Sequence, residues 1–153
     1  MARTRIARSV LVVSVLLAVG ALGSATASAA VLDDYLWKQR PLLLFAPMAN
    51  DPRLVETQKR IEASRCDFVE RDMVLGRVVS EGDSTLDGQV VDTDEARRLI
   101  ARYAVDENAF TAVLIGKDGG EKFRVNGVPD LDGIYAVIDG MPMRQNEAND
   151  GRC

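Results

Sequence analysis

Cysteine and histidine, the side chains that most often carry nucleophilic, redox or zinc chemistry, are scarce in this chain. Its 153 residues include two cysteines, Cys66 and Cys153, and no histidine. The lack of histidine excludes Ser-His-Asp and Cys-His catalytic groups and the common zinc sites. The two cysteines are too far apart in the sequence to form a Cys-x-x-Cys dithiol. We therefore expect no catalytic residue of these classes, no bound metal and no cofactor.

Cys66 has three possible roles. Two cysteines in an oxidising compartment usually pair, which favours a disulfide between Cys66 and Cys153. A buried unpaired thiol and a catalytic nucleophile are the alternatives that the residues leave open.

Three arginines, Arg40, Arg71 and Arg144, form a second candidate site. Arg71 lies between Glu70 and Asp72 in a segment that reads as a strand, where a charge must be paired or reach solvent. One interpretation is that internal ion pairs tie the first strand and the C-terminal tail to the sheet. The other is a guanidinium cluster for an anionic ligand, because arginine forks match carboxylate and phosphate groups.

An acidic stretch partly matches the pattern of a calcium-binding loop. Positions one, three, five, six and twelve would be Asp83, Thr85, Asp87, Gly88 and Asp94. Threonine at the third position, the lack of glutamate at the twelfth and the lack of a clear preceding helix argue against an EF-hand site. We interpret the stretch as a solvated loop.

The N-terminus reads as a targeting segment. A basic start (Arg3 to Arg8) precedes the apolar run Val10 to Leu22 and the small-residue pattern Ala27 to Ala29. Thirteen apolar residues rise only about 20 Å as a helix, short of the roughly 30 Å hydrocarbon core of a membrane. We predict a signal peptide at 1–29, cleaved after Ala29 or Ala27. Cleavage would leave an exported protein, periplasmic or secreted, with no membrane attachment.

The remaining chain is the size of one domain, which we place at 30–140, with a C-terminal tail at 141–153. The whole chain has 19 Lys and Arg against 23 Asp and Glu, and the signal peptide takes three of the arginines with it. An acidic domain is poorly suited to nucleic acid or to an anionic membrane surface. Nucleic acid is therefore not expected as a partner. An unidentified protein, or a small anionic ligand on the three arginines, is the expected partner.

The order of predicted elements indicates an α/β fold. Leu42 to Phe45 has the continuous apolar character of a buried strand, and Asp51 followed by Pro52 is typical of a helix start. The further predictions are a helix at 52–64, a strand at 66–75, an irregular hairpin or acidic loop at 76–91, a helix at 92–104, strands at 111–115 and 122–125 around a turn at 116–120, and a last helix opened by Pro129 and Asp130. This βαβ-α-ββα order is that of the thioredoxin-like fold, a central mixed β-sheet flanked by helices.

Thioredoxin-like oxidoreductases carry their dithiol in the turn after the first of these strands. Here that turn holds Met48, Ala49, Asn50 and Asp51. Before the third strand, where thioredoxins carry a cis-proline facing the cysteines, this chain has Phe110. Both halves of the redox site are missing.

The chain resembles the exported thioredoxin-like family named domain of unknown function 4174 (DUF4174). The residues that carry the resemblance are Tyr35-Leu36-Trp37, Arg40, Leu42 to Pro47, Glu70-Arg71-Asp72, Leu114 to Gly119 and Ile138 to Gln145. The resemblance implies a fold and an exported location but no established activity.

Together these features predict an exported thioredoxin-like domain that lacks the Cys-x-x-Cys site and acts as a non-catalytic binding or interaction module. The alternative is an extracytoplasmic oxidoreductase or a peroxiredoxin-like enzyme that uses non-standard residues, as the fold suggests by analogy.

Overall fold

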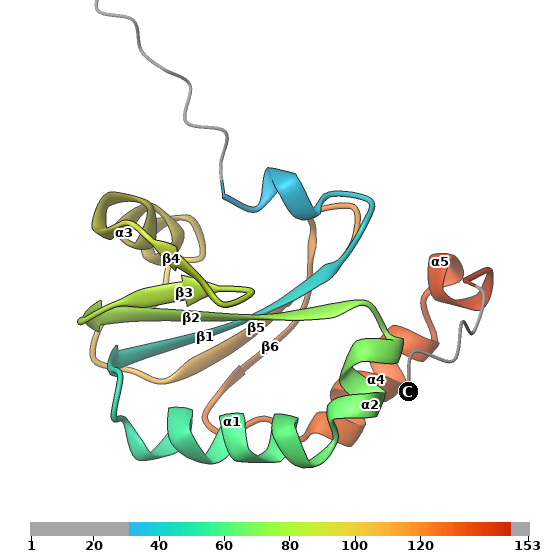
Figure 1. Ribbon diagram of the computed structural model, residues 1–153, viewed down its shortest axis with the longest axis horizontal. Coiled ribbons are helices and arrows are strands. Elements are labelled where there is room, and N and C mark those ends of the chain that lie inside the picture. Colours follow the sequence, from blue (N-terminus) through green and yellow to red (C-terminus); the bar gives the residue numbers. More distant parts are fainter. Residues whose placement is uncertain (1–30, 148–153) are drawn as a thin grey trace, which may run out of the picture.

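The computed structural model describes residues 31–147, so the predicted signal peptide and Cys153 lie outside the described residues. Six strands form one sheet with short and long helices on both of its faces (Figure 1). In chain order the elements are η1 (Asp33–Tyr35), β1 (Arg40–Met48), α1 (Pro52–Ala63), α2 (Arg65–Glu70), β2 (Met73–Glu81), β3 (Ser84–Leu86), β4 (Gln89–Val91), α3 (Thr93–Arg102), β5 (Thr111–Ile115), β6 (Glu121–Asn126), α4 (Leu131–Asp139) and α5 (Pro142–Gln145).

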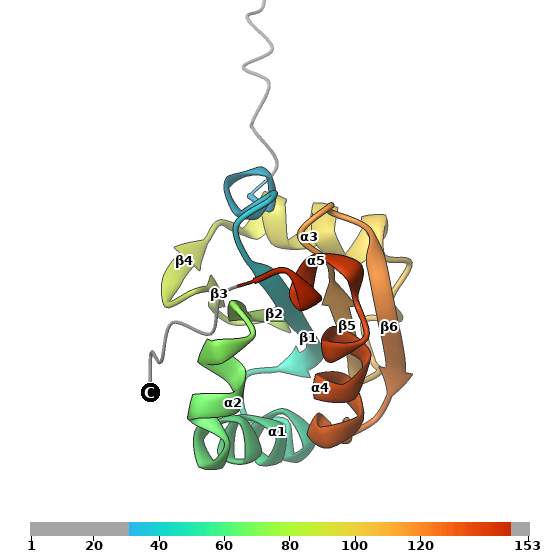
Figure 2. The same ribbon diagram turned by 90° about the vertical axis from the view of Figure 1, so that its right-hand side faces the viewer.

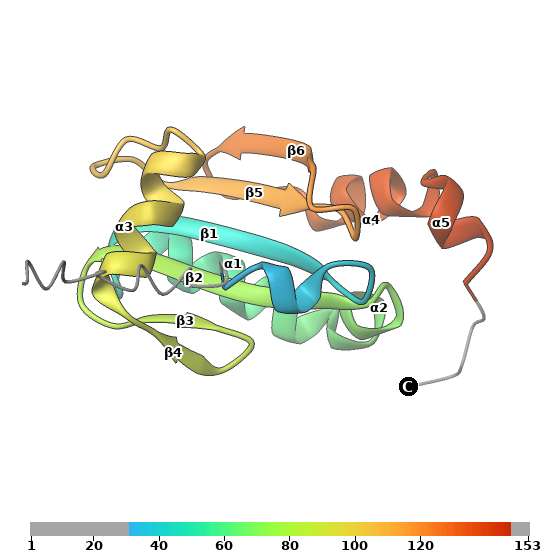
Figure 3. The same ribbon diagram turned by 90° about the horizontal axis from the view of Figure 1, so that it is seen from above.

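β1 is a central strand of the sheet, whose order is β4-β3-β2-β1-β5-β6. It runs parallel to β2 and antiparallel to β5, and Figure 3 shows the β3–β4 hairpin and β6 at the two edges. Leu42 and Leu44 pack on one face and Leu43 and Phe45 on the other, which explains the unbroken apolar run in the sequence. Opposite Leu43, Gly76 leaves no room for a Cβ, which would lie 2.5 Å from a Leu43 methyl carbon.

Two helical layers cover the sheet. Helices α1, α2 and α4 pack on one face, and α3 with the N-terminal turn η1 packs on the other (Figures 1 and 2). Helix α5 lies at the end of the sheet where β1 begins, opposite the β1–α1 turn (Figure 1). Among the described residues, no helix has the length and apolar character needed to cross a membrane.

Two predicted elements are wrong. The segment from Cys66 does not enter a strand directly, because Arg65–Glu70 forms helix α2 and β2 begins only at Met73. Arg71 is therefore the residue that ends α2 rather than a mid-strand residue. The predicted tail is also structured at its start, since Pro142–Gln145 forms α5.

Candidate functional site

The β1–α1 turn presents Met48, Ala49 and Asn50 on the surface, while Asp51 is buried at the start of α1. Asp51 Oδ1 accepts hydrogen bonds from the backbone N–H of Arg53 (2.9 Å) and from Arg53 Nε (3.0 Å), and Oδ2 accepts one from Arg53 Nη2 (2.6 Å). Hydrogen bonding by Arg53 lowers the pKa of the Asp51 carboxyl, although its burial opposes the shift. A carboxylate of the chain itself thus occupies the helix N-terminus, where the backbone N–H groups favour an anion.

Phe110 lies next to this turn and directly precedes β5. Its ring is 1% exposed, and the guanidinium carbon of Arg53 lies 5.6 Å from the ring centroid. None of the peptide bonds among residues 31–147 is cis. The Asp51–Arg53 ion pair and the Arg53–Phe110 cation–aromatic contact therefore lie where a dithiol oxidoreductase would have its two thiols.

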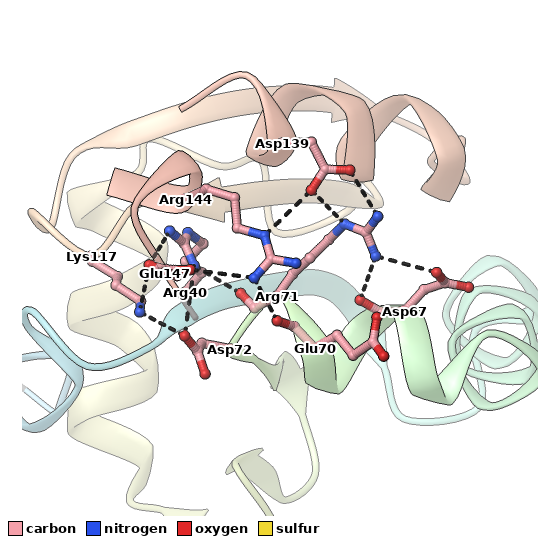
Figure 4. Close-up of polar contacts among 9 residues, drawn as sticks. All are labelled: Arg40, Asp67, Glu70, Arg71, Asp72, Lys117, Asp139, Arg144 and Glu147. Atoms are coloured by element: carbon pink, nitrogen blue, oxygen red, sulfur yellow. Dashed lines mark hydrogen bonds and ion pairs between the residues drawn. The ribbon is translucent and has the colours of Figure 1, made fainter. Parts of the chain in front are cut away.

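The three arginines of the second candidate site lie together at the opposite end of the sheet (Figure 4). Arg40, the first residue of β1, is 1% exposed. Its Nη1 and Nη2 donate hydrogen bonds to the two carboxylate oxygens of Glu147, at 3.1 and 2.8 Å, and Nη1 also donates to the Arg71 carbonyl at 2.9 Å. A buried arginine is tolerated in this paired and hydrogen-bonded form.

Lys117 and Asp72 complete the buried centre of the site. Lys117 Nζ lies 2.6 Å from Asp72 Oδ2 and 2.7 Å from Glu147 Oε1. Neither Lys117 nor Glu147 is recognisable as a site residue in the sequence, because Lys117 reads as a residue of a hairpin turn and Glu147 falls in the predicted tail. The i,i+3 spacing of Arg144 and Glu147 was the available local signal, and their side chains lie 3.6 Å apart.

Arg71 and Arg144 form the outer part of the same site. Arg71 donates hydrogen bonds to Asp139 at 2.8 and 3.0 Å and to the Asp67 carboxylate at 3.2 Å. Arg144 donates to the Glu70 carbonyl at 2.8 Å and lies 3.5 Å from Asp139. These contacts join α2, α4 and α5 at one corner of the domain (Figure 4).

The charges of this ion-pair cluster balance. Its cations are Arg40, Arg71, Lys117 and Arg144, and its carboxylates are Asp67, Asp72, Asp139 and Glu147. An added anion would have to displace a carboxylate that is already in place. The adjacent cavity, about 130 Å³ beside Lys117 and Met141 to Met143, is also smaller than the roughly 300 Å³ of a small ligand pocket. The geometry agrees with the interpretation that these arginines pair internally.

The remaining predicted site residues lie apart from this cluster. Cys66 is exposed on α2, so the alternative of a buried thiol is wrong. Because Cys153 lies outside the described residues, the Cys66–Cys153 disulfide stays a prediction. The calcium-like positions fall on the β3–β4 hairpin and α3 rather than in one loop between helices. Across residues 31–147, no group of three or more His, Cys, Asp or Glu is arranged to hold a metal ion.

A family model described as domain of unknown function (DUF4174) matches residues 31–147. The chain belongs to this family. The matched region continues through α5 to Glu147, so both helices that contribute to the ion-pair cluster after β6 fall within it. No curated protein matches the chain in sequence.

Solved structures resemble the DUF4174 domain in fold. Reduced 2-Cys peroxiredoxin of Plasmodium vivax has a TM-score of 0.58 and 16% identity, over 76% of this chain and 85% of that chain. Thioredoxin peroxidase I of Plasmodium yoelii has a TM-score of 0.53 and 20% identity, over 75% and 79%. At this identity the likeness shows the fold alone, and it confirms the predicted α/β thioredoxin-like architecture.

The ion-pair cluster should make the stability of the DUF4174 domain depend on acid pH through Glu147. Burial raises the pKa of Glu147, but hydrogen bonds from Arg40 and Lys117 outweigh it and lower the pKa from 4.5 to about 2. A lowered pKa means that the stabilisation is complete above about pH 4.5 and is lost as the pH falls from there to about 2. The shift corresponds to a contribution on the order of 3 kcal/mol.

Urea unfolding of the wild type and of Glu147→Gln across this pH range measures the effect. The difference in unfolding free energy between the two proteins should shrink as the pH falls. A difference that stays constant from pH 6 to pH 2 would contradict the assigned role of Glu147.

Proposed function

We propose that this DUF4174 domain is an exported, non-catalytic binding module built on a thioredoxin-like scaffold. The single observation that carries the proposal is the Asp51 carboxylate at the N-terminus of α1, held there by its cap hydrogen bond and by the Arg53 side chain. In thiol oxidoreductases the helix N-terminus lowers the pKa of a nucleophilic cysteine. Here the same helix N-terminus stabilises the Asp51 carboxylate, which pairs with Arg53.

The two solved structures described above are named as a 2-Cys peroxiredoxin and a thioredoxin peroxidase. This domain differs from a thiol peroxidase in having no cysteine in the β1–α1 turn. Cys66, the cysteine nearer in sequence, lies on α2, after the whole length of α1. The apolar N-terminal segment with its small-residue pattern supports export. In an oxidising compartment, an exposed cysteine is better suited to a disulfide than to a reduced nucleophile.

Redox assays on the mature protein test the proposal. We expect no acceleration of insulin disulfide reduction by dithiothreitol and no peroxide consumption above the level of Cys66→Ser. A thioredoxin and a 2-Cys peroxiredoxin serve as positive controls in the same buffers. Turnover that Cys66→Ser abolishes would assign catalysis to this thiol and overturn the proposal. Turnover that persists in Cys66→Ser would also overturn the non-catalytic proposal, because it would show that residues other than Cys66 catalyse the reaction.

A further inference from the structure

Most arginines in the described part of the chain face a carboxylate. Those that do are Arg40, Arg53, Arg60, Arg71, Arg97, Arg98, Arg124 and Arg144. Arg102 instead lies over the ring of Tyr103, at 5.6 Å from the ring centroid. The two that remain, Arg65 and Arg77, have no ion pair or side-chain hydrogen bond within residues 31–147, and both line one cavity.

This Arg65–Arg77 cavity has a volume of about 510 Å³, within the range of small-molecule sites. Its walls come from α1, α2, β2 and the β3–β4 hairpin, and Figure 2 shows α2 lying toward β3 at this side of the sheet. Phe68, Met73 and Leu75 give it an apolar wall. Gln58 and Thr85 add neutral hydrogen-bonding groups. The lining thus combines an apolar wall with several polar and charged groups, which can hold the two parts of an amphipathic small molecule.

Arg77 is the unusual member of this lining. Strand alternation places it on the same face of β2 as Met73 and Leu75, under α1 and α2 rather than at the solvent edge. Its Nε is buried and has no hydrogen-bond partner. An unmet donor of a charged group carries a desolvation cost, which an acceptor bound in the cavity would remove.

The charge of the cavity selects among anions. Asp87 is the carboxylate in its lining, so two guanidinium groups and one carboxylate leave one net positive charge. A singly charged carboxylate neutralises it, and the planar fork of arginine matches that group. A phosphate dianion would overcompensate the charge and face repulsion from Asp87.

We propose that the Arg65–Arg77 cavity binds a small organic monocarboxylate, with its carboxylate on the two arginines and its apolar body against Phe68, Met73 and Leu75. The inference deepens the proposed binding function and rests on it. It also moves the predicted anionic ligand away from Arg40, Arg71 and Arg144, whose charges are already compensated within the fold.

Titration of the ¹⁵N-labelled mature protein with sodium benzoate, followed by amide chemical shifts at constant ionic strength, tests the site. We expect saturable shifts confined to the cavity lining, including the Gln58 side-chain amide. Arg77→Gln should weaken binding by about tenfold or more, since a charge-assisted hydrogen bond is lost. Arg65→Gln should also weaken it, and gives a second variant on a different element.

Arg97→Gln is the matched control, because it removes one exposed, ion-paired arginine from the other face of the sheet and should leave benzoate affinity within about twofold. Sodium phosphate is the comparison ligand. Absence of saturable shifts, shifts scattered over the surface, equal binding of phosphate, or unchanged affinity in Arg77→Gln would each overturn the proposal. The readout requires no turnover, so this failure is distinguishable from a positive redox assay, which would overturn the non-catalytic function instead.

Discussion

Replacing Arg40 with methionine should destabilise the domain by about 3 to 5 kcal/mol, the cost of leaving buried charges without their partner. Arg40 is 1% exposed and holds both carboxylate oxygens of Glu147. Without it, Glu147 and Asp72, which are themselves largely shielded from water, would keep Lys117 as their shared cation, and Glu147 would have only the longer contact to Arg144 besides. The Arg71 carbonyl would also lose its guanidinium donor. Urea unfolding at neutral pH and low salt measures the change.

Arg71→Met is the matched comparison, because it removes an arginine of the same cluster whose carboxylate partners are close to water. The side chains of Asp139 and Asp67 are 45% and 57% exposed, so they can be hydrated once Arg71 is gone. We expect a clearly smaller loss than in Arg40→Met. Adding Glu147→Gln to Arg40→Met should recover part of the stability, since it removes one uncompensated charge. Equal stability of Arg40→Met and the wild type would contradict a buried role for the pair.

The central unit of the fold was accessible from the sequence because its signals are local. The four apolar residues Leu42 to Phe45 became the middle of β1, and Asp51-Pro52 became the cap and first residue of α1. Asp92 likewise caps α3 by accepting the N–H of Glu95 at 2.9 Å. The Glu95 carboxylate does not bond back to the N–H of Asp92, as it would in a full capping box; it pairs with Arg98 one turn along α3 and accepts the N–H of Val31, a contact that depends on tertiary packing.

Helix α2 shows why a short element escapes pattern analysis. Its six residues make fewer than two helical turns. That is too short for a helical spacing of apolar residues to be told apart from the apolar run of the strand that follows. The boundary is set instead by Asp72, whose backbone adopts a positive φ of 52° between α2 and β2. Aspartate tolerates this conformation better than most residues, but the tendency is too weak to predict a helix end.

Of the candidate sites, the arginines could be predicted from the sequence but their carboxylate partners could not. The partners come from distant segments, as with Arg40 and Glu147, which are 107 residues apart. Whether an arginine is compensated is therefore a tertiary property. Arg65 and Arg77 gave no sequence signal, because what distinguishes them is that neither forms an ion pair within residues 31–147 although both line one cavity.

We predict a Cys66–Cys153 disulfide that stabilises the protein by about 4 to 5 kcal/mol in the chain-entropy model, since it closes a loop of about 88 residues. Within the described residues, α5 contacts the end of α2, the helix that carries Cys66. Arg144 bonds the carbonyl of Glu70, which lies four residues after Cys66 on α2, about 6 Å along the helix. From Glu147, six further residues can span up to about 20 Å.

Thiol titration of denatured, unreduced protein from the exported fraction should find no free thiol, and reductant should lower the melting temperature. Cys66→Ser, Cys153→Ser and the double variant form the control set: if one bond joins the two residues, the double variant should be no less stable than either single variant. Additive losses would point to separate roles for the two cysteines. Two free thiols per chain would refute the bridge, and a dimer that runs as such only on non-reducing gels would place Cys153 in contact with another molecule instead.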